Sequence, residues 1–282
     1  MTISKRMRTL LIIVGSVILV VGALLAAGPS IIQAMGVHKE YTGPRYELPG
    51  GKALIIATNH DELGDDGTKT GVFGSELTAP YYEFLDNGME VDIASIEGGE
   101  IPFDPLSFNR FIISDYDKRM EKDPVLLAKV ENSIPIGDLD FADYDIIFLA
   151  GGWGAAYDLG FSQELGDKMT EGYVAGAVVG GVCHGQLGLL NARDENGDPL
   201  VQGRTIVAVT DKQVDELGIN ITPQHPETEL RKAGANFESA TAFRDFFASH
   251  TVVDGRIVSG QNQNDGPEVA HLMMQVAGGT QL

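Results

Sequence analysis

The stretch VAGAVVGGVCHGQLGLL, residues 174–190, decides the fold and contains the only cysteine of the 282-residue chain. Its first half is an apolar run of the kind that forms a strand buried on both faces of a parallel sheet. Cys183 follows this run in the pattern Gly-x-Cys-x-Gly, with His184 directly after it. A tight turn from strand to helix brings two backbones close together and needs small residues on both sides of the side chain that it presents. The stretch therefore predicts a nucleophile elbow at Cys183.

The predicted elbow would place Cys183 at the start of a helix. Free amide groups and the positive end of the helix dipole stabilise a thiolate, so we expect a reactive thiol with a lowered pKa. The alternative is an inert cysteine in the core, which is common for a lone cysteine. The flanking glycines and the adjacent His184 favour the reactive thiol.

Apolar strands alternate with helices along most of the chain. Strands are expected within 52–60, 89–96, 143–154 and 175–185, and helices over 75–88, 124–132 and 162–173. This alternation predicts an α/β fold, a parallel sheet sandwiched by helices. Beyond residue 192 the pattern changes to an α+β extension with two hairpins, around Asn196-Gly197 and Asp254-Gly255, and a closing helix.

The N-terminus carries an uncharged run, residues 10–27, behind a tail that holds Lys5, Arg6 and Arg8. Eighteen apolar residues are about enough to cross a bilayer, and the positive-inside rule keeps the tail in the cytoplasm. We expect a single-pass inner-membrane protein whose domain lies on the extracytoplasmic side. The expected boundaries are 1–9 for the tail, 10–30 for the transmembrane anchor, 31–50 for a linker and 51–280 for the domain. The alternative is a cleaved signal peptide, although its apolar core would be shorter, about 7–15 residues.

The charge of the chain limits its partners. The net charge is −20 at pH 7, and the first 37 residues contain no acidic side chain, so the acidic excess belongs to the domain. Binding of nucleic acid needs a basic surface, and we expect none. One cysteine allows no internal disulfide, and no zinc-type spacing of Cys and His occurs. We therefore expect no metal site.

Several motifs together resemble the ThiJ/PfpI superfamily, a branch of the flavodoxin-like, class I glutamine amidotransferase-like fold. They are GGVCHG at the elbow, IIFLAGGWGAAYDL before it, GVFGSELTAPYYEFLDNGMEVDIASIEGGEIPFDPLS near the start, and ELRKAGANFE and VVDGRIVSGQN near the end. The branch that is most similar contains glutathione-independent glyoxalase III, protein deglycases and heat-inducible chaperones. The resemblance covers about residues 52–277.

The resemblance implies a catalytic set of Cys183, His184 and Glu76. Glu76 stands in GSELTAP, where the family has a glutamate that hydrogen-bonds the cysteine sulfur. A carboxyl beside a thiolate would have a raised pKa and could carry protons near neutral pH. The alternative for Glu76 is an ordinary first-turn acid that complements the helix dipole.

Two features depart from the family pattern. The loop that usually reads Gly-Gly-His-Gly contains Trp153 here, so no metal site is carried over, and Trp153 is expected in the pocket wall or in core packing. The acid that orients the histidine is missing from its expected position near Gln213 or Val214. His184 is then oriented by Asp215, by a backbone carbonyl or by no partner, and Asp215 is the candidate acid.

Other expected pocket residues are the glycines of the same loop and one histidine. Gly151 and Gly152 would supply amide groups at an oxyanion position, and His60 ends the first strand on the same edge of the sheet.

The implied activity is cysteine-dependent chemistry on a small reactive carbonyl, such as conversion of methylglyoxal to lactate or deglycation, without a metal or organic cofactor. The alternatives are a cysteine hydrolase, amidase or peptidase of the same fold, a holdase chaperone, and a redox sensor. A homodimer is left open by the sequence.

Overall fold

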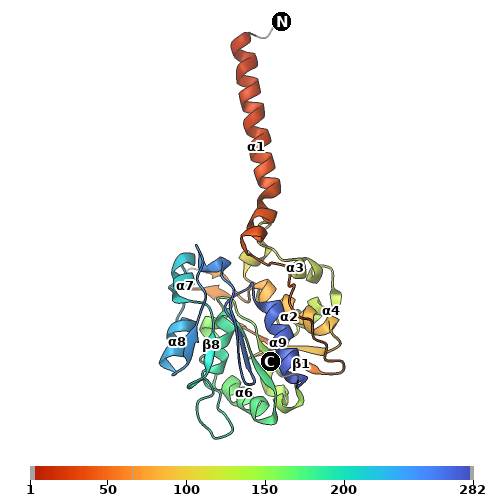
Figure 1. The fold of residues 1–282 in the computed structure, drawn as a ribbon, viewed down its shortest axis with the longest axis vertical. Helices are drawn as coiled ribbons and strands as arrows, with labels where there is room; N and C mark the ends of the chain where they lie inside the picture. Colours follow the sequence, from red (N-terminus) through yellow and green to blue (C-terminus); the bar gives the residue numbers. More distant parts are fainter. Residues whose placement is uncertain (1–3, 66, 280–282) are drawn as a thin grey trace.

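A central sheet organises the domain (Figure 1). The computed structural model describes residues 4–65 and 67–279, and within them the sheet has seven strands in the order β10-β11-β7-β6-β1-β4-β5. Neighbouring strands are parallel, except that β10 and β11 form an antiparallel pair. The strands are β1 (Lys52–Ala57), β4 (Glu90–Ser95), β5 (Ile134–Pro135), β6 (Ile146–Leu149), β7 (Val178–Val182), β10 (Thr251–Asp254) and β11 (Ile257–Gly260).

Helices cover both faces of this sheet. One core lies under α2, α4 and α9, and the other lies under α6 and α8. The bounds of these helices are α2 (Gly74–Asp86), α4 (Pro124–Glu131), α6 (Gln163–Ala175), α8 (Pro226–Lys232) and α9 (Gly266–Ala277). Strand β1 is apolar beyond its first residue because its side chains enter both cores in alternation: Ile55 belongs to the first core, while Leu54 and Ile56 belong to the second. The predicted parallel sheet sandwiched by helices is confirmed.

Shorter elements complete the described residues. They are α3 (Asp115–Met120), α5 (Ala155–Asp158), α7 (Asp211–Leu217), β2 (Glu62–Leu63), β3 (Thr68–Lys69), β8 (Thr205–Val207), β9 (Asn236–Glu238) and the 3₁₀ helices η1 (Pro105–Phe108), η2 (Ile136–Asp138), η3 (Phe141–Asp143), η4 (Cys183–Leu189) and η5 (Asp245–Phe247).

The two predicted hairpins have different outcomes. The one around Asp254-Gly255 is confirmed as β10 and β11, and β11 joins the central sheet in parallel beside β7. The one around Asn196-Gly197 is wrong, because β8 pairs in parallel with β9 instead. Asp194 Oδ1 accepts amide hydrogen bonds from Asn196 and Asp198, which close a tight turn with no strand ladder beyond an isolated bridge.

Helix α1 (Lys5–Met35) projects from the domain as a rod (Figure 1). Ser4 Oγ caps its first turn by accepting the Met7 amide, and Gly36, with φ +128°, ends it. Its most apolar 18-residue window has a mean hydropathy of 3.0 and is not buried by the domain. By length and composition this helix could cross a membrane. Of the predicted boundaries, residues 1–3 of the tail and residue 280 lie outside the described residues.

Candidate active site

The turn at Cys183 has the strained, closely packed backbone that the flanking glycines predict. Cys183 has φ +58°, in the left-handed region that few non-glycine residues adopt. A Cβ atom on Gly181 would lie 2.0 Å from the carbonyl oxygen of Leu149, and one on Gly185 would lie 2.2 Å from the same atom. Both glycines are therefore required because the turn passes directly over the end of strand β6.

The thiol of Cys183 is nearly enclosed. The residue is 5% exposed, and Sγ lies 3.4 Å from His184 Nδ1. Burial raises the pKa of the Cys183 thiol well above its ordinary value, and the carboxylate of Glu76 raises it further. The amide groups of His184 and Gly152 act on the sulfur in the opposite direction. The expected lowered pKa is therefore wrong, because desolvation outweighs the amide groups at the start of η4.

Glu76 lies in the first turn of α2, directly beside the thiol. It is 1% exposed, and burial raises the pKa of its carboxyl to about 8, although interactions with Cys183 and the Gly151 amide lower it. Oε2 is buried without a geometrically acceptable hydrogen-bond partner in the described part of the chain. A Cβ atom on Gly151 would lie 2.3 Å from this oxygen and 2.9 Å from Cys183 Cβ. Gly151 thus leaves the space in which carboxyl and thiol meet.

His184 is the third group of the predicted set. It is completely buried, and burial, followed by the charge of His225, lowers its pKa to about 3. Its Nε2 has no hydrogen-bond partner among the described residues. The imidazole is therefore neutral near pH 7, a weak base with no acid to orient it.

The structure does not bring Asp215 to His184. Asp215 is exposed on α7 and accepts a hydrogen bond of 2.6 Å from Asn220. The buried face of α7 instead carries Gln213, whose Oε1 accepts from Asn262. The candidate acid points to solvent because the register of this short helix turns Gln213 inward.

The other predicted pocket residues lie on the same edge of the sheet. Gly152 has φ +105°, and its amide acts on the Cys183 sulfur. Trp153 is half-buried and packs against the core cluster that contains Cys183. His60 stacks on Tyr157 with 4.1 Å between ring centroids and its Nε2 contacts the carbonyl oxygen of Glu62, so the contacts described for its ring are to α5 and β2 and not to the thiol.

Sequence reasoning missed a second buried acid, Asp265, at the start of α9. It is completely buried, and burial raises its pKa to about 6 against opposing hydrogen bonds from the Ser249 hydroxyl and from amides that include Gln261. Its charge also raises the pKa of Glu76. The polar run GQNQND after the apolar strand IVS was the available signal, because polar residues at the end of a buried strand lie at the functional edge of the sheet.

The described residues contain no group of three or more His, Cys, Asp or Glu side chains arranged to hold a metal ion. What they bring together is a nucleophile, a carboxyl that can gain or lose a proton near neutral pH, and two amide groups aimed at the sulfur. This combination suits attack of a thiol on a carbonyl carbon, followed by proton transfer.

Comparison with known proteins agrees with this arrangement. The chain is 32% identical over 225 residues to "Glyoxalase 3" of Candida albicans, which covers 78% of this chain and 95% of that protein. It is 30% identical over 232 residues to "Glutathione-independent glyoxalase HSP31" of Saccharomyces cerevisiae, with 78% and 93% covered.

Solved structures show the same fold. The crystal structure of glyoxalase III from Candida albicans has a TM-score of 0.73 at 30% identity and covers 80% of this chain and 97% of its own. The Rapid Encystment Protein 24 KDa of Francisella tularensis has a TM-score of 0.74 at 31% identity, with 80% and 99% covered. Residues 68–275 match the DJ-1/PfpI family. The chain therefore belongs to the DJ-1/PfpI family.

Proposed function

We propose that this protein is a glutathione-independent glyoxalase that converts a small 2-oxoaldehyde such as methylglyoxal to the 2-hydroxy acid. The observation that carries the proposal is the buried contact between the Cys183 thiol and the Glu76 carboxyl, whose pKa is about 8. Relatives that are named glyoxalases cover most of the chain, which supports the same substrate class.

The reaction uses the thiol and the carboxyl in turn. Cys183 Sγ attacks the aldehyde carbon, and the thiol proton moves to the aldehyde oxygen, which gives a hemithioacetal. In the ionised fraction, the Glu76 carboxylate removes the proton from this carbon, which gives an enediolate, and then delivers it to the former ketone carbon. The hydroxyl proton of the hemithioacetal moves to the former ketone oxygen, which gives a thioester. Water then cleaves the thioester, so that substrate and water together yield the hydroxy acid and the free thiol.

The amide of Gly152 and the neutral His184 have supporting roles in this scheme. The amide lies where negative charge develops near the sulfur. His184 Nδ1 contacts Sγ at 3.4 Å. This contact can fix the orientation of the S–H bond without protonation of the imidazole.

Lactate formation by the full chain from methylglyoxal, without glutathione, tests the proposal. Cys183→Ala should abolish it, and Glu76→Gln should lower turnover by about 10²–10⁴-fold, as expected for a general acid–base group. His60→Gln is the matched control, because His60 lies on the same edge but contacts Tyr157. Activity on esters or amides alone would indicate the hydrolase, and aggregation suppression that survives Cys183→Ala would indicate the chaperone.

We also propose that α1 anchors the domain to the membrane, with the domain on the extracytoplasmic side. The apolar helix with its basic flank, Lys5, Arg6 and Arg8, supports this orientation. Membrane fractionation and protease accessibility in spheroplasts test it. A soluble product that begins near residue 37 would show cleavage instead, and protection of the domain in intact spheroplasts would contradict the orientation.

A further inference from the structure

We infer that the edge of the sheet that carries Cys183 faces the bilayer, and that the loops 109–113 and 243–247 rest on the lipid surface. We call these two loops the lipid-facing rim. The inference rests on the proposed anchoring by α1. It adds that the domain is held in one orientation, with the thiol toward the membrane.

The foot of α1 is docked on the domain by specific contacts. The His38 amide donates to Asn264 Oδ1 at 3.1 Å, and the His38 ring stacks on Phe73 with 6.4 Å between centroids. Val37 is 2% exposed. A Cβ atom on Gly36 would lie 3.0 Å from the carbonyl oxygen of Phe247. Because three consecutive residues, Gly36, Val37 and His38, pack closely against the domain, α1 has a defined place on it.

These docking residues lie at the carboxyl ends of the strands. Phe73 directly precedes α2, and Asn264 follows β11. The Phe73 amide donates to the Gly151 carbonyl, and a Cβ atom on Gly151 would lie 2.9 Å from Cys183 Cβ. The foot of the anchor is thus separated from the thiol by only two residues in contact with each other.

Loop 109–113 contacts α1 at the end of its uncharged run, near Leu25 and Gly28. Arg110 Nη2 donates to the carbonyl oxygen of Leu25 at 3.0 Å, and the Phe111 ring lies 2.7 Å from where a Cβ atom on Gly28 would be. Leu25 is part of the uncharged run that would fill the bilayer. A domain loop that touches this turn must therefore lie at the membrane interface, where an arginine and an aromatic ring are favourable.

The second loop of the rim presents apolar surface without a covering partner in the described structure. Phe243 is 89% exposed, in the segment after β9 that continues to Phe247 at the foot of α1. Both loops of the rim thus adjoin the anchor helix. The occupant that fits is a lipid surface, because a helix suited to span the bilayer leaves the same face.

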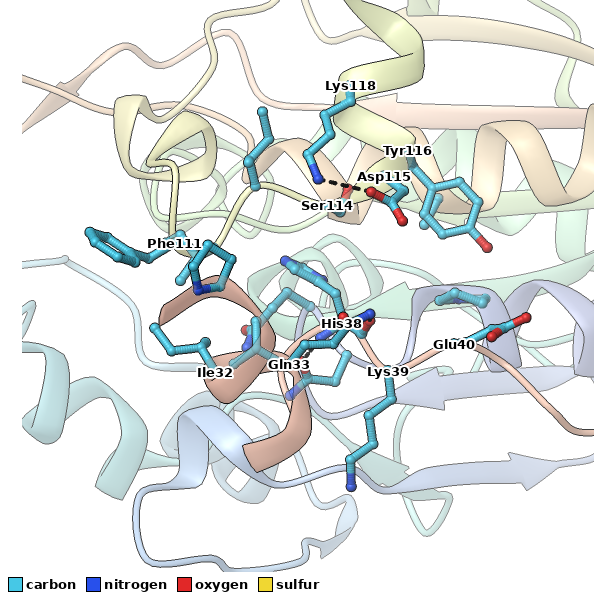
Figure 2. Close-up of a pocket in the computed structure, with 18 of the residues that line it drawn as sticks. Ile32, Gln33, His38, Lys39, Glu40, Phe111, Ser114, Asp115, Tyr116 and Lys118 are labelled. Carbon is cyan, nitrogen blue, oxygen red and sulfur yellow. Dashed lines mark hydrogen bonds and ion pairs between the residues drawn. The ribbon is translucent and has the colours of Figure 1, made fainter. Parts of the chain in front are cut away.

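A cavity of about 550 Å³ lies within this junction, between α1 and α3. Figure 2 shows Ile32, Gln33 and His38 on one side, with Phe111, Asp115 and Lys118 across from them. Lys118 pairs with Asp115 at 2.8 Å. The cavity is lined by side chains of both charge signs, which suits a position beside zwitterionic lipid headgroups.

Three single-cysteine proteins test the orientation. In the full-length Cys183→Ala background, Phe243→Cys marks the rim, Leu19→Cys marks the middle of α1, and Val174→Cys is the matched control. Val174 is an exposed apolar residue near the end of α6, at the amino ends of the strands. A strand of six residues separates the two edges by ~20 Å.

Each protein is labelled with a fluorophore and reconstituted in phosphatidylcholine vesicles that contain nitroxide-labelled lipid. We expect the Leu19 site to be quenched best by nitroxide on the acyl chain. The Phe243 site should be quenched by headgroup nitroxide at least about twofold more than the Val174 site, because interfacial side chains lie within ~10 Å of the headgroups.

The outcomes separate the anchor from the orientation. Quenching at Leu19 with equal, weak quenching at Phe243 and Val174 would overturn the inference and leave the anchor intact. Quenching stronger at Val174 than at Phe243 would mean the opposite edge faces the bilayer. Absence of quenching at Leu19 would overturn the anchor and the inference together, while lactate formation tests the enzyme independently.

Discussion

Replacing Glu76 by glutamine should stabilise the folded protein at alkaline pH while it removes most of the turnover. The carboxyl is 1% exposed, and burial raises its pKa from 4.5 to about 8. Between these values the folded protein holds a proton that the unfolded chain has lost. The free energy of unfolding of the wild type therefore falls as pH rises through this window.

The magnitude follows from the two pKa values. Their difference corresponds to about 5 kcal/mol for a fully buried group. A third of this would still shift the melting temperature by about 3–6 °C in a domain of this size. Glutamine does not titrate, so Glu76→Gln avoids the fall in the free energy of unfolding that the wild type shows at high pH.

The assay is thermal unfolding of the full chain in detergent micelles at pH 5, 7 and 9. The melting temperature of Glu76→Gln minus that of the wild type should grow with pH. Asp215→Asn is the matched control, an acid-to-amide change on an exposed residue, and its difference should stay near zero. A Glu76→Gln difference that is the same at all three pH values would refute the claim that the buried carboxyl is protonated at neutral pH.

Three further predictions concern the elbow, the missing acid and a buried pair. Gly185→Ala should cost about 3 kcal/mol or more of stability by denaturant unfolding, because its Cβ would lie 2.2 Å from the carbonyl oxygen of Leu149. Asp215→Asn should lower lactate turnover by much less than the factor of about 10² or more that is expected when an acid–base group is removed, because the Asp215 carboxylate is bound to Asn220. His271→Ala should lower the free energy of unfolding by about 1–3 kcal/mol, because Glu83 Oε2 loses its 3.0 Å partner while the carboxyl still accepts from the Tyr116 hydroxyl.

The elbow and the sheet could be predicted because they depend on local pattern. An apolar run that ends in Gly-x-Cys-x-Gly can form few structures, and the carbonyl of Leu149 explains why no larger residue would serve at either glycine. The alternation of strands and helices then defines the edge on which Cys183 and Glu76 meet.

The missing acid could not be predicted in this way. Helix α7 has seven residues, too few for a periodic pattern to show which side is buried. Gln213 turns inward and Asp215 turns outward, a choice made by packing against distant segments such as Asn262. The direction of the Cys183 pKa was missed for a related reason, because the sequence does not show how completely the thiol is enclosed.

Burial moves the titratable groups of the site in directions that all favour neutral forms. It raises the pKa values of Cys183, Glu76 and Asp265 and lowers that of His184, because a low-dielectric interior disfavours every charge. The thiol, the carboxyl of Glu76 and the imidazole are therefore mainly uncharged at neutral pH. A neutral aldehyde can enter such a site without bringing an unpaired charge, whereas a carboxylate would meet acids and no cation among these groups. The electrostatics thus favour a small uncharged carbonyl as substrate, and they explain why the acid product would leave once the thioester is cleaved.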